Sequence, residues 1–483
     1  MDNTLLIEKI DQTYIKVNCE QHIQYELSDY FTFDVPGAKF MPAVRNRFWD
    51  GKIRLFSVKT GKIYYGLLKY IELFAKNNNY SIKYVSEFNN DPLSVHEGNL
   101  FVQSLNLPLQ PRDYQIESFI NCVRNKRQLV VSPTASGKSL IIYLLTRYYN
   151  ARTLIIVPTT SLVSQLASDF SDYGYQSDKF IHRIFAGEDK QTDKPITIST
   201  WQSLYKLPKE FFKNFDVVIG DEAHLFQAKS LTTIMQKLVN TQYRFGFTGT
   251  LDGTQTHRLV LEGLFGSVSK TISTSQLIEK KHLAEFKIKC LVLKYPDNDR
   301  RNISKCDYHQ EIDFIVRNNA RNKFIKNLAI SLEGNTLLLF QYVDKHGKVL
   351  YDLIANHAID RNVYYVSGEV DGQTREQIRS VVEKENNAII VASSGVFSTG
   401  INIRNLHNII FSSPTKSRIR NLQSIGRGLR RSETKTQCTL FDIVDDLKYN
   451  QNNNFTLDHF VERVKIYNEE NFPYKIYPVS LKD

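Results

Sequence analysis

The sequence predicts an α/β protein in which two tandem domains, each built on a parallel β-sheet, lie between a small α+β N-terminal domain and a short helical C-terminal extension. Three observations lead to this prediction. Short apolar segments alternate with longer segments of helical periodicity from about residue 105 onward. The alternation starts again after about residue 285, and residues 1–100 instead mix short alternating strands with helices. Strands that alternate with helices form parallel sheets covered on both faces.

The expected elements follow in chain order. In the first domain, residues 1–100, a strand is expected over 14–19 and helices near 20–31 and 65–78. Turn-forming residues at 89–92 and 110–111 place a domain boundary near 95–110. The second domain, residues 105–280, has expected strands at 129–131, 153–157, 195–199, 215–219 and 244–248, and expected helices at 138–149 and 160–173. The third domain, residues 285–447, has expected strands at 336–340, 363–366, 388–392, 408–411 and 439–442. The extension, residues 448–483, begins as a polar linker and continues into an amphipathic helix around 456–470.

Composition narrows the class of protein. The chain has 483 residues, 42% apolar and 23% charged, which is ordinary for globular proteins. It contains no run of 18 apolar residues and no signal-peptide pattern at its start, so we expect neither a membrane span nor secretion. The five cysteines are scattered without a Cys-x-x-Cys pair, which favours a reducing, cytoplasmic compartment and argues against a structural zinc site.

Positive charge is concentrated near the N-terminus. The chain carries a net charge of +11, and the segment 36–85 alone has ten Lys or Arg against two acidic residues, a net charge of +8. Ten aromatic residues are interleaved with these charges. Such a segment suits a nucleic-acid surface, where cations follow phosphates and rings stack on bases. The alternative is a small domain with an aromatic core and a solvated basic face. The best candidates for nucleic-acid contact are Arg45, Arg47, Lys52 and Arg54.

Two segments together predict a site that hydrolyses a nucleoside triphosphate. The first, residues 132–139, reads SPTASGKS and matches the second half of a phosphate-binding loop, although Ser132 stands where the leading glycine is usual. The phosphates would be held by the backbone of Thr134, Ala135, Ser136 and Gly137, by the amine of Lys138, and through Mg²⁺ on Ser139. The second segment, Asp-Glu-Ala-His, follows an apolar strand. Asp221 would hold the metal and Glu222 would take a proton from the attacking water.

Two arginines near residue 430 suit the other side of such a site. Arg427 and Arg430 are three residues apart, so they share one face of a helix. Guanidinium groups stabilise the charge that builds up on a γ-phosphate during transfer. An isolated Arg-x-x-Arg is usually a solvated helix face. In combination with the two segments above, the catalytic interpretation is favoured.

Further motifs complete a recognisable set. In chain order they are Arg112-Asp113-Tyr114-Gln115, which resembles an adenine-reading element, residues 157–162 with Thr159, which resemble motif Ia, residues 199–203 with Trp201, which occupy the place of a strand-binding segment, Thr248-Gly249-Thr250, which resembles motif III, residues 393–403 with Gly400, which resemble motif V, and residues 423–430 with Gln423, which resemble motif VI. This ordered set resembles the superfamily 2 helicases. The resemblance implies two RecA-like domains that close over ATP and Mg²⁺. It also implies that Gln115 pairs with the adenine base and that His224 links the nucleotide to Thr248 and Thr250, the alternative being a core histidine.

The subfamily can be narrowed from the motifs. Thr-Gly-Thr in motif III and Gln-Ser in motif VI differ from the Ser-Ala-Thr and Gln-Arg of the RNA helicases named after Asp-Glu-Ala-His. Together with residues 48–55, 364–371 and 395–400, they resemble a family of bacteriophage DNA helicases. The resemblance implies action on branched DNA, including Holliday junctions, replication forks and R-loops, in recombination, replication and repair. The implied partners are branched, single-stranded and duplex DNA and RNA–DNA hybrids, with the protein acting as a monomer in the host cytoplasm. Asn402 departs from the aspartate that many superfamily members carry.

Two alternatives remain open from the sequence. One is a motor that moves along duplex DNA without separating the strands. The other is a nucleic-acid-binding protein in which ATP acts only as a switch, and the presence of Glu222 and both arginines argues against it.

Overall fold

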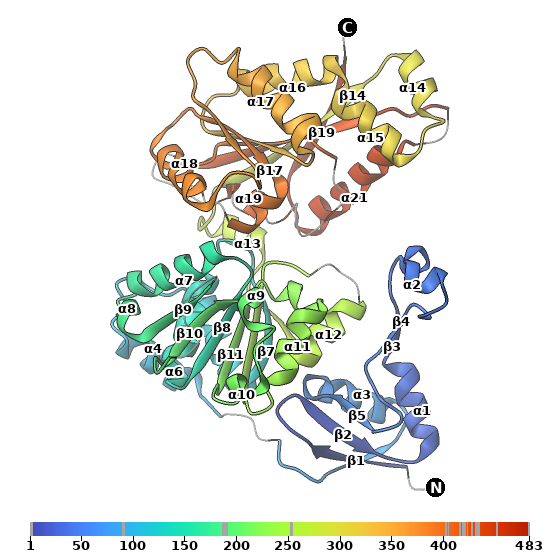
Figure 1. Ribbon diagram of the computed structural model, residues 1–483. Helices are drawn as coiled ribbons and strands as arrows, with labels where there is room; N and C mark the ends of the chain where they lie inside the picture. Colours follow the sequence, from blue (N-terminus) through green and yellow to red (C-terminus); the bar gives the residue numbers. More distant parts are fainter. Residues whose placement is uncertain are drawn as a thin grey trace. The chain divides into compact units, whose positions relative to one another are not determined.

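The computed structural model divides into two compact units, which are described separately (Figure 1). It describes residues 3–88, 92–185, 192–251, 255–400, 403, 405–414, 417, 422, 424–426, 428–429, 435–450 and 453–481. Within these ranges it describes no side chains for residues 227, 255–257, 372 and 398–400. Unit 1 comprises the chain to Thr271 apart from the loop 133–136, and unit 2 comprises that loop and the chain from Ile272. None of the helices in these described ranges is long and apolar enough to cross a membrane.

Unit 1 begins with a mixed four-stranded sheet in the order β5-β2-β1-β6. The elements of this N-terminal domain are β1 (Thr4–Lys9), β2 (Tyr14–Asn18), α1 (Gln21–Tyr30), β5 (Lys62–Tyr64), α3 (Leu68–Asn77) and β6 (Ser81–Tyr84). The strands alternate as the sequence does, so that Leu5 and Ile7 of β1 are fully buried. They pack with Leu27 of α1 and Ile71 of α3 in one apolar core.

A two-stranded ribbon extends from this domain. It consists of β3 (Thr32–Asp34) and β4 (Lys52–Arg54), which pair antiparallel and carry a tip built from η1 (Ala38–Phe40) and α2 (Pro42–Arg45). The tip contains two glycines with positive φ, Gly37 and Gly51. A Cβ atom at Gly51 would lie 3.0 Å from the Cβ of Ala38, so glycine also allows the close approach of these two segments. This ribbon holds the basic residues that the sequence singled out (Figure 1).

The rest of unit 1 is a seven-stranded, wholly parallel sheet in the order β13-β7-β12-β11-β8-β10-β9. Its strands are β7 (Arg127–Val131), β8 (Thr153–Val157), β9 (Ile181–Ile184), β10 (Ile196–Thr200), β11 (Val217–Asp221), β12 (Tyr243–Thr248) and β13 (Val268–Lys270). Its helices are α4 (Val95–Ser104), α5 (Asp113–Asn125), α6 (Lys138–Tyr149), α7 (Thr160–Asp172), α8 (Ser177–Phe180), α9 (Trp201–Leu204), α10 (Lys209–Phe212), η3 (Ala223–Gln227), α11 (Lys229–Lys237) and α12 (Gln255–Phe265).

The two faces of this sheet carry different cores. Leu129 of β7 packs with residues of α11 and α12, whereas its neighbour Val130 packs with residues of α5, α6 and α7. Successive strand residues point to opposite faces, so an apolar run such as that of β7 is expected for a strand buried on both sides. The core on the α11 and α12 face is continuous with the core of the N-terminal domain.

Two buried arginines attach the N-terminal domain to this sheet. Arg244, fully buried at the start of β12, donates hydrogen bonds to Thr13 Oγ1 at 2.9 Å and to the carbonyl oxygen of Leu238. Arg127, at the start of β7, donates to the carbonyl oxygen of Gln12 at 2.5 Å, and its guanidinium lies 4.0 Å from the centre of the Tyr65 ring. The turn between β1 and β2 is thus bound to the amino ends of two neighbouring sheet strands.

Unit 2 contains a second seven-stranded parallel sheet, in the order β16-β17-β15-β18-β19-β14-β20. Its strands are β14 (Glu285–Lys294), β15 (Thr336–Phe340), β16 (Val363–Val366), β17 (Ile389–Ser393), β18 (Asn408–Phe411), β19 (Gln437–Asp446) and β20 (Tyr474–Ser480). Its helices are α13 (Thr274–Glu279), α14 (Asp297–Ile303), α15 (Tyr308–Arg317), α16 (Asn319–Ser331), η4 (Val343–Gly347), α17 (Lys348–Ala355), α18 (Gly372–Lys384), α19 (Ser394–Gly400) and α21 (Phe455–Glu469). The expected pair of parallel-sheet domains after a small α+β domain is therefore confirmed.

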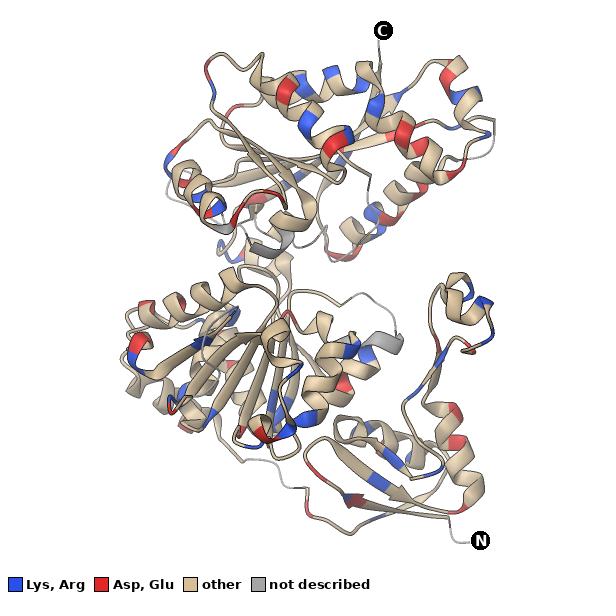
Figure 2. Cartoon of the chain, viewed as in Figure 1, with Lys and Arg blue, Asp and Glu red and all other residues tan. Residues whose placement is uncertain are grey.

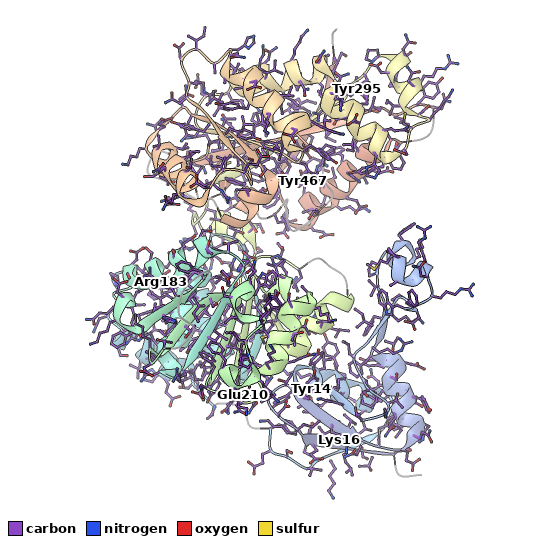
Figure 3. The ribbon with its side chains drawn as sticks, viewed as in Figure 1. Tyr14, Lys16, Arg183, Glu210, Tyr295 and Tyr467 are labelled. Carbon is purple, nitrogen blue, oxygen red and sulfur yellow. The ribbon has the colours of Figure 1, made fainter. Side chains whose placement is uncertain are left out.

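A buried ionic cluster ties α21 to this second sheet. Arg463 of α21 donates to Asp442 Oδ2 of β19 at 2.8 Å, and Tyr467, labelled in Figure 3, donates to the same oxygen at 2.8 Å. All three side chains are almost completely buried. A second buried ion pair joins Arg321 to Asp445, which also accepts a hydrogen bond from Tyr295 at 2.8 Å.

Among the elements that were not expected from the sequence, two bear on the limits of the domains. Helix α4 lies within the stretch expected as a boundary, and a capping box between Ser94 and Glu97 starts it. The C-terminal extension contains the expected helix but continues into β20, which pairs with β14 at the edge of the second sheet. Most side chains of β20 are exposed, as befits an edge strand, so its sequence lacks the apolar run used to find the other strands.

Candidate active site

The phosphate-binding loop joins β7 to α6, as the spacing predicts. The loop turns into the helix at Gly137, whose φ of 83° is the left-handed conformation that glycine adopts without strain. The backbone N–H of Ser132 donates to the carbonyl oxygen of Thr248 at 2.9 Å, and Lys138 Nζ donates to the carbonyl oxygen of Ser132 at 3.3 Å. The lysine amine therefore lies at the loop that would surround the phosphates.

Gln115 connects the expected adenine-binding segment to this loop. Its Oε1 accepts the backbone N–H of Arg112 at 2.9 Å, and its Nε2 lies 3.5 Å from the carbonyl oxygen of Gly137 as a donor. A Cβ atom at Gly137 would lie 2.3 Å from that Nε2, so a larger residue at this position would displace the amide. Arg112 itself donates to the hydroxyl of Tyr114 at 2.9 Å.

The carboxylates stand at the end of a neighbouring strand. Strand β12 lies between β7 and β11, so the carboxyl ends of all three strands meet at one edge of the sheet. Asp221 is the last residue of β11, and its Oδ1 accepts the backbone N–H of Glu222 at 3.0 Å. Burial and the neighbouring Glu222 raise the pKa of Asp221 to about 6, and the ammonium of Lys138 acts in the opposite direction.

This carboxylate and the hydroxyl of Ser139 fit Mg²⁺. Both supply oxygen ligands, which this cation prefers. Burial is the main cause of the raised pKa of Asp221 and the neighbouring Glu222 adds to it, so a divalent cation at this position would stabilise the ionised carboxylates. Glu222 is the residue beyond Asp221 and is held with a φ of 53°, in the left-handed region that side chains other than glycine rarely adopt.

A chain of polar contacts leads from Glu222 to motif III. His224 Nδ1 lies 3.3 Å from Glu222 Oε2 and 3.0 Å from Thr248 Oγ1. The Thr248 hydroxyl donates its single proton to the carbonyl oxygen of Thr250 at 2.9 Å. Thr248 Oγ1 must therefore accept from His224, which assigns the proton to Nδ1. Thr250 Oγ1 is buried without a hydrogen-bond partner among the residues that the structure describes, an uncommon state for a buried hydroxyl.

The two nucleic-acid candidates in the parallel-sheet part of unit 1 differ in their surroundings. Thr159 is the N-cap of α7, and its Oγ1 accepts the backbone N–H of Leu162 at 3.4 Å. A helix N-terminus of this kind suits a phosphate. Trp201 begins the short helix α9, and its ring is partly buried against the apolar core. Much of the Trp201 side chain is therefore used in packing against the core rather than exposed to a ligand.

The four candidates on the ribbon differ in their ion pairing. The side chains of Arg45, Arg47 and Lys52 are exposed and form no ion pair among the described residues. The fourth, Arg54, is paired with Asp50 at 2.5 Å. Figure 2 shows the basic residues of this ribbon. Two aromatic side chains at its tip, Phe40 and Phe48, are 74% and 86% exposed, whereas Phe56 and Phe74 are buried in the core.

Three of the candidates in motif VI lie outside the described residues. These are Gln423, Arg427 and Arg430. Gly400 of motif V is the last residue of α19, but the structure describes only its backbone. Their expected roles rest on the sequence motifs.

One contact at the site has no counterpart in the sequence motifs. The hydroxyl of Tyr173, at the end of α7, lies 2.8 Å from Ser139 Oγ. The sequence contains no signal for this pair, because Tyr173 belongs to no motif and lies 34 residues from Ser139.

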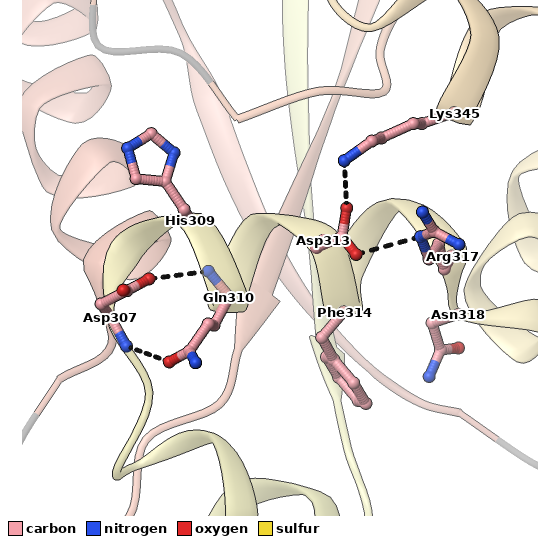
Figure 4. A pocket seen from close by; sticks show the side chains of 8 residues that line it. All are labelled: Asp307, His309, Gln310, Asp313, Phe314, Arg317, Asn318 and Lys345. Carbon is pink, nitrogen blue, oxygen red and sulfur yellow. Dashed lines mark hydrogen bonds and ion pairs between the residues drawn. The ribbon is translucent and has the colours of Figure 1, made fainter.

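Unit 2 has a hollow on its surface that is separate from these residues (Figure 4). It encloses about 690 Å³ and is lined by residues of α15 and η4. Asp313 stands at its centre and pairs with Lys345 at 2.7 Å and with Arg317 at 3.0 Å. These two cations hold the pKa of Asp313 below its usual range. Because the charges pair with one another, the hollow does not offer a concentrated charge to a ligand.

Three family models match the chain in order. The model described as "DNA helicase UvsW, N-terminal" matches residues 5–85. The model described as "Type III restriction enzyme, res subunit" matches residues 108–253, which include the phosphate-binding loop and Asp221. The model described as "Helicase conserved C-terminal domain" matches residues 319–432.

Known proteins resemble the chain over nearly its whole length. The ATP-dependent DNA helicase uvsW of Enterobacteria phage T4 is 36% identical over 498 aligned residues, which cover 98% of each chain. The crystal structure of T4 UvsW covers 100% of both chains with 34% identity and a TM-score of 0.53. The DNA 3'-5' translocase XPB2 of Sulfurisphaera tokodaii is 25% identical over 380 residues, covering 71% of this chain and 84% of that protein.

The similarity therefore includes the N-terminal domain as well as the two parallel-sheet domains. Identity of 36% over almost the full length of both proteins, with the same fold, is sufficient to assign the family. The chain belongs to the UvsW family of ATP-dependent DNA helicases, within superfamily 2.

Proposed function

We propose that this helicase uses ATP and Mg²⁺ to remodel branched DNA, including Holliday junctions, replication forks and R-loops, in phage recombination, replication and repair. The observation that carries the proposal is the meeting of the phosphate-binding loop, Asp221 and Thr248 at the carboxyl ends of three neighbouring strands. In unit 1, which contains Asp221 and Thr248, a ribbon exposes basic and aromatic side chains suited to DNA.

The proposed roles in hydrolysis follow from the chemistry of each group. Lys138 and the backbone of residues 134–137 would bind the phosphates, and Ser139 and Asp221 would hold Mg²⁺, which neutralises charge on the phosphate oxygens. Glu222 would accept the proton of the attacking water. Arg427 and Arg430 would stabilise the charge on the transferred phosphoryl group, and Gln115 with Arg112 would select adenine. Gly400 and Gln423 would complete the nucleotide contacts.

The proposed coupling to DNA uses the chain of polar contacts through His224. A change in charge at Glu222 would be felt at Thr248 and Thr250 through the imidazole, since its Nδ1 is within reach of both neighbours. Thr159 and Trp201 would contact the strand backbone, and such contacts are largely independent of sequence. Arg45, Arg47, Lys52 and Arg54 would hold the duplex or branch point.

We further propose four functional regions. Residues 1–100 would bind DNA, residues 105–280 and 285–447 would form the two RecA-like motor domains, and residues 448–483 would extend the second motor domain. The protein would act as a monomer in the host cytoplasm, on single-stranded, duplex and branched DNA and on RNA–DNA hybrids.

Hydrolysis by a Lys138→Ala variant is the direct test of the ATP site. Loss of an amine that meets developing charge is expected to lower kcat about a hundredfold or more, while DNA binding is retained. ATP hydrolysis would be measured without nucleic acid and with single-stranded DNA, a four-way junction or single-stranded RNA. The exposed Lys213, in the same unit, provides the matched control Lys213→Ala.

Each outcome bears on one part of the proposal. Stimulation that is greatest with the junction supports action on branched DNA, whereas stimulation mainly by RNA contradicts it. A folded Lys138→Ala protein that no longer binds DNA would show that Lys138 belongs to a nucleic-acid surface instead.

A second candidate is a duplex translocase that does not separate strands. The match of residues 108–253 to a restriction-enzyme subunit favours it. Unwinding of a forked DNA, with a non-hydrolysable ATP analogue as control, distinguishes the two. Displacement of a triplex strand along duplex DNA without any unwinding of the fork would favour the translocase.

A further inference from the structure

The hydroxyl of Ser139 has a fixed neighbour. Tyr173 OH lies 2.8 Å from Ser139 Oγ, a distance typical of a hydrogen bond between hydroxyl groups. Ser139 is the second residue of α6, directly beyond the phosphate-binding loop, and Tyr173 ends α7. The contact therefore joins the loop to a second helix of the same unit.

Packing holds the Tyr173 ring in place. Tyr143 stands four residues after Ser139 on α6, so the two side chains share one face of the helix. The rings of Tyr173 and Tyr143 have their centres 5.3 Å apart. Tyr143 is 1% exposed and also contacts Phe170 of α7 at 5.1 Å between ring centres. Tyr173 thus lies along α6 with its ring on Tyr143 and its hydroxyl on Ser139.

The direction of the hydrogen bond has a consequence for metal binding. A serine hydroxyl has one proton and two lone pairs. To bind a cation, it must direct a lone pair at the metal and its proton elsewhere. Either hydroxyl can be the donor in this contact. When Ser139 donates to Tyr173 OH, its proton points at the tyrosine and its lone pairs are left for the metal.

We propose that Tyr173 is a positioning residue that orients the Ser139 hydroxyl for Mg²⁺. This inference rests on the proposed role of Ser139 as a metal ligand and adds a second residue to it. Tyr173 does not touch the metal or the nucleotide in this proposal. Its effect is exerted through the rotamer and proton direction of Ser139.

The test measures Mg²⁺-dependent binding of a fluorescent ADP to the full-length protein, without turnover. Tyr173→Phe removes only the hydroxyl and keeps the ring that packs on Tyr143. We expect the Mg²⁺ concentration for half-maximal nucleotide binding to rise about fivefold, as for loss of one ordinary hydrogen bond. Binding of the same nucleotide in the presence of a chelator should not change.

A matched control is available in the same aromatic cluster. Tyr143→Phe also removes one hydroxyl, which accepts a hydrogen bond from Arg147 at 2.7 Å and does not contact Ser139. It should leave the Mg²⁺ dependence at the wild-type value. Thermal unfolding of both variants verifies that the aromatic cluster remains folded.

The variant Ser139→Ala separates this inference from the proposal on which it rests. If Ser139→Ala raises the Mg²⁺ concentration for half-maximal nucleotide binding and Tyr173→Phe adds no further rise in the double variant, the two residues act together as proposed. If Ser139→Ala has the effect and Tyr173→Phe alone has none, or tightens Mg²⁺ binding, the positioning role is wrong. If Ser139→Ala itself has no effect, the metal assignment of Ser139 fails first.

Discussion

At the scale of single residues, the segment from Glu222 to His224 combines backbone strain with a specific hydrogen-bond geometry. The φ of 53° at Glu222 costs on the order of 1 kcal/mol or more for a residue with a side chain. This conformation follows directly after β11 and brings Glu222 Oε2 to 3.3 Å from His224 Nδ1. Such strain is retained where the surrounding structure fixes it, which is common at active sites.

His224 is expected to affect coupling more than hydrolysis itself. In a His224→Ala variant, Thr248 Oγ1 loses the N–H that it accepts, and the connection from Glu222 to motif III is broken. We expect hydrolysis without DNA to change less than threefold and its stimulation by DNA to fall roughly tenfold, as for loss of one charge-assisted hydrogen bond. Steady-state hydrolysis with and without DNA measures both values. Equal loss in both conditions would place His224 in the chemical step instead.

Gln115 allows base recognition to be separated from support of the loop. If its amide reads adenine, Gln115→Ala should reduce the preference for ATP over GTP about tenfold, the value of one lost base-specific contact. If its main role is to lie over Gly137, affinity for both nucleotides should fall by the same factor. Competition binding with ATP and GTP decides between them. Glu117→Ala, exposed on the same helix, is the control.

At the scale of elements, α21 is part of the second parallel-sheet domain. The guanidinium of Arg463 and the hydroxyl of Tyr467 both meet Asp442 Oδ2, and the helix is followed by β20, which extends the same sheet. Burial by itself lowers the pKa of Arg463, but the nearby Asp442 carboxylate raises it, and the net result is a raised pKa. Helix α21 is therefore packed on the second sheet, although a polar linker precedes it.

Removing one partner of that buried pair should destabilise unit 2. Arg463→Ala leaves the Asp442 carboxylate buried without its cation, and such losses cost about 3–5 kcal/mol. Lys465→Ala, on the same helix, removes an exposed pair with Glu462 that contributes at most about 1 kcal/mol. Denaturant unfolding of both variants gives the comparison. Similar stabilities for the two would mean that α21 contributes little to the folding of the sheet.

At the scale of the whole molecule, positive charge is distributed unevenly. The chain carries +11, and the segment 36–85 contributes +8 of it. Within unit 1 the domain bearing this charge is bound to the strands that lead to the loop and to motif III, through Arg127 on β7 and Arg244 on β12. DNA held by the ribbon would thus be attached to the domain that is bound to β7 and β12, the strands that lead into the phosphate-binding loop and motif III.

Reversal of the ribbon charges should reduce the salt dependence of DNA binding. Each phosphate contact releases about one counterion, so replacing Arg45, Arg47 and Lys52 with glutamate should lower the slope of log affinity against log salt by about three. Lys59, Lys76 and Lys83, changed to glutamate in the same domain, alter the net charge equally and provide the control. Equal slopes for the two triple variants would indicate a general charge effect rather than contact by the ribbon.

Local sequence patterns predicted the motifs, most strands of the two parallel sheets, and the helices α6, α7 and α21. The limits of α6, β8, β15, β16 and β18 agree with those expected, because local apolar periodicity and turn residues specify where such elements begin and end. The residue types that bind phosphate and metal are also local, since a loop between strand and helix supplies them in a short stretch.

Only the tertiary structure decided which distant residues meet. It placed β12 between β7 and β11, joined β20 to β14, and brought Tyr173 to Ser139 and Arg244 to Thr13. These pairings have no signature in the local sequence, because they form only when strands pair in the sheet and side chains pack between the helices. The chemical groups of the site can be identified in the sequence, but the distances between these groups depend on the packing of segments far apart in the chain.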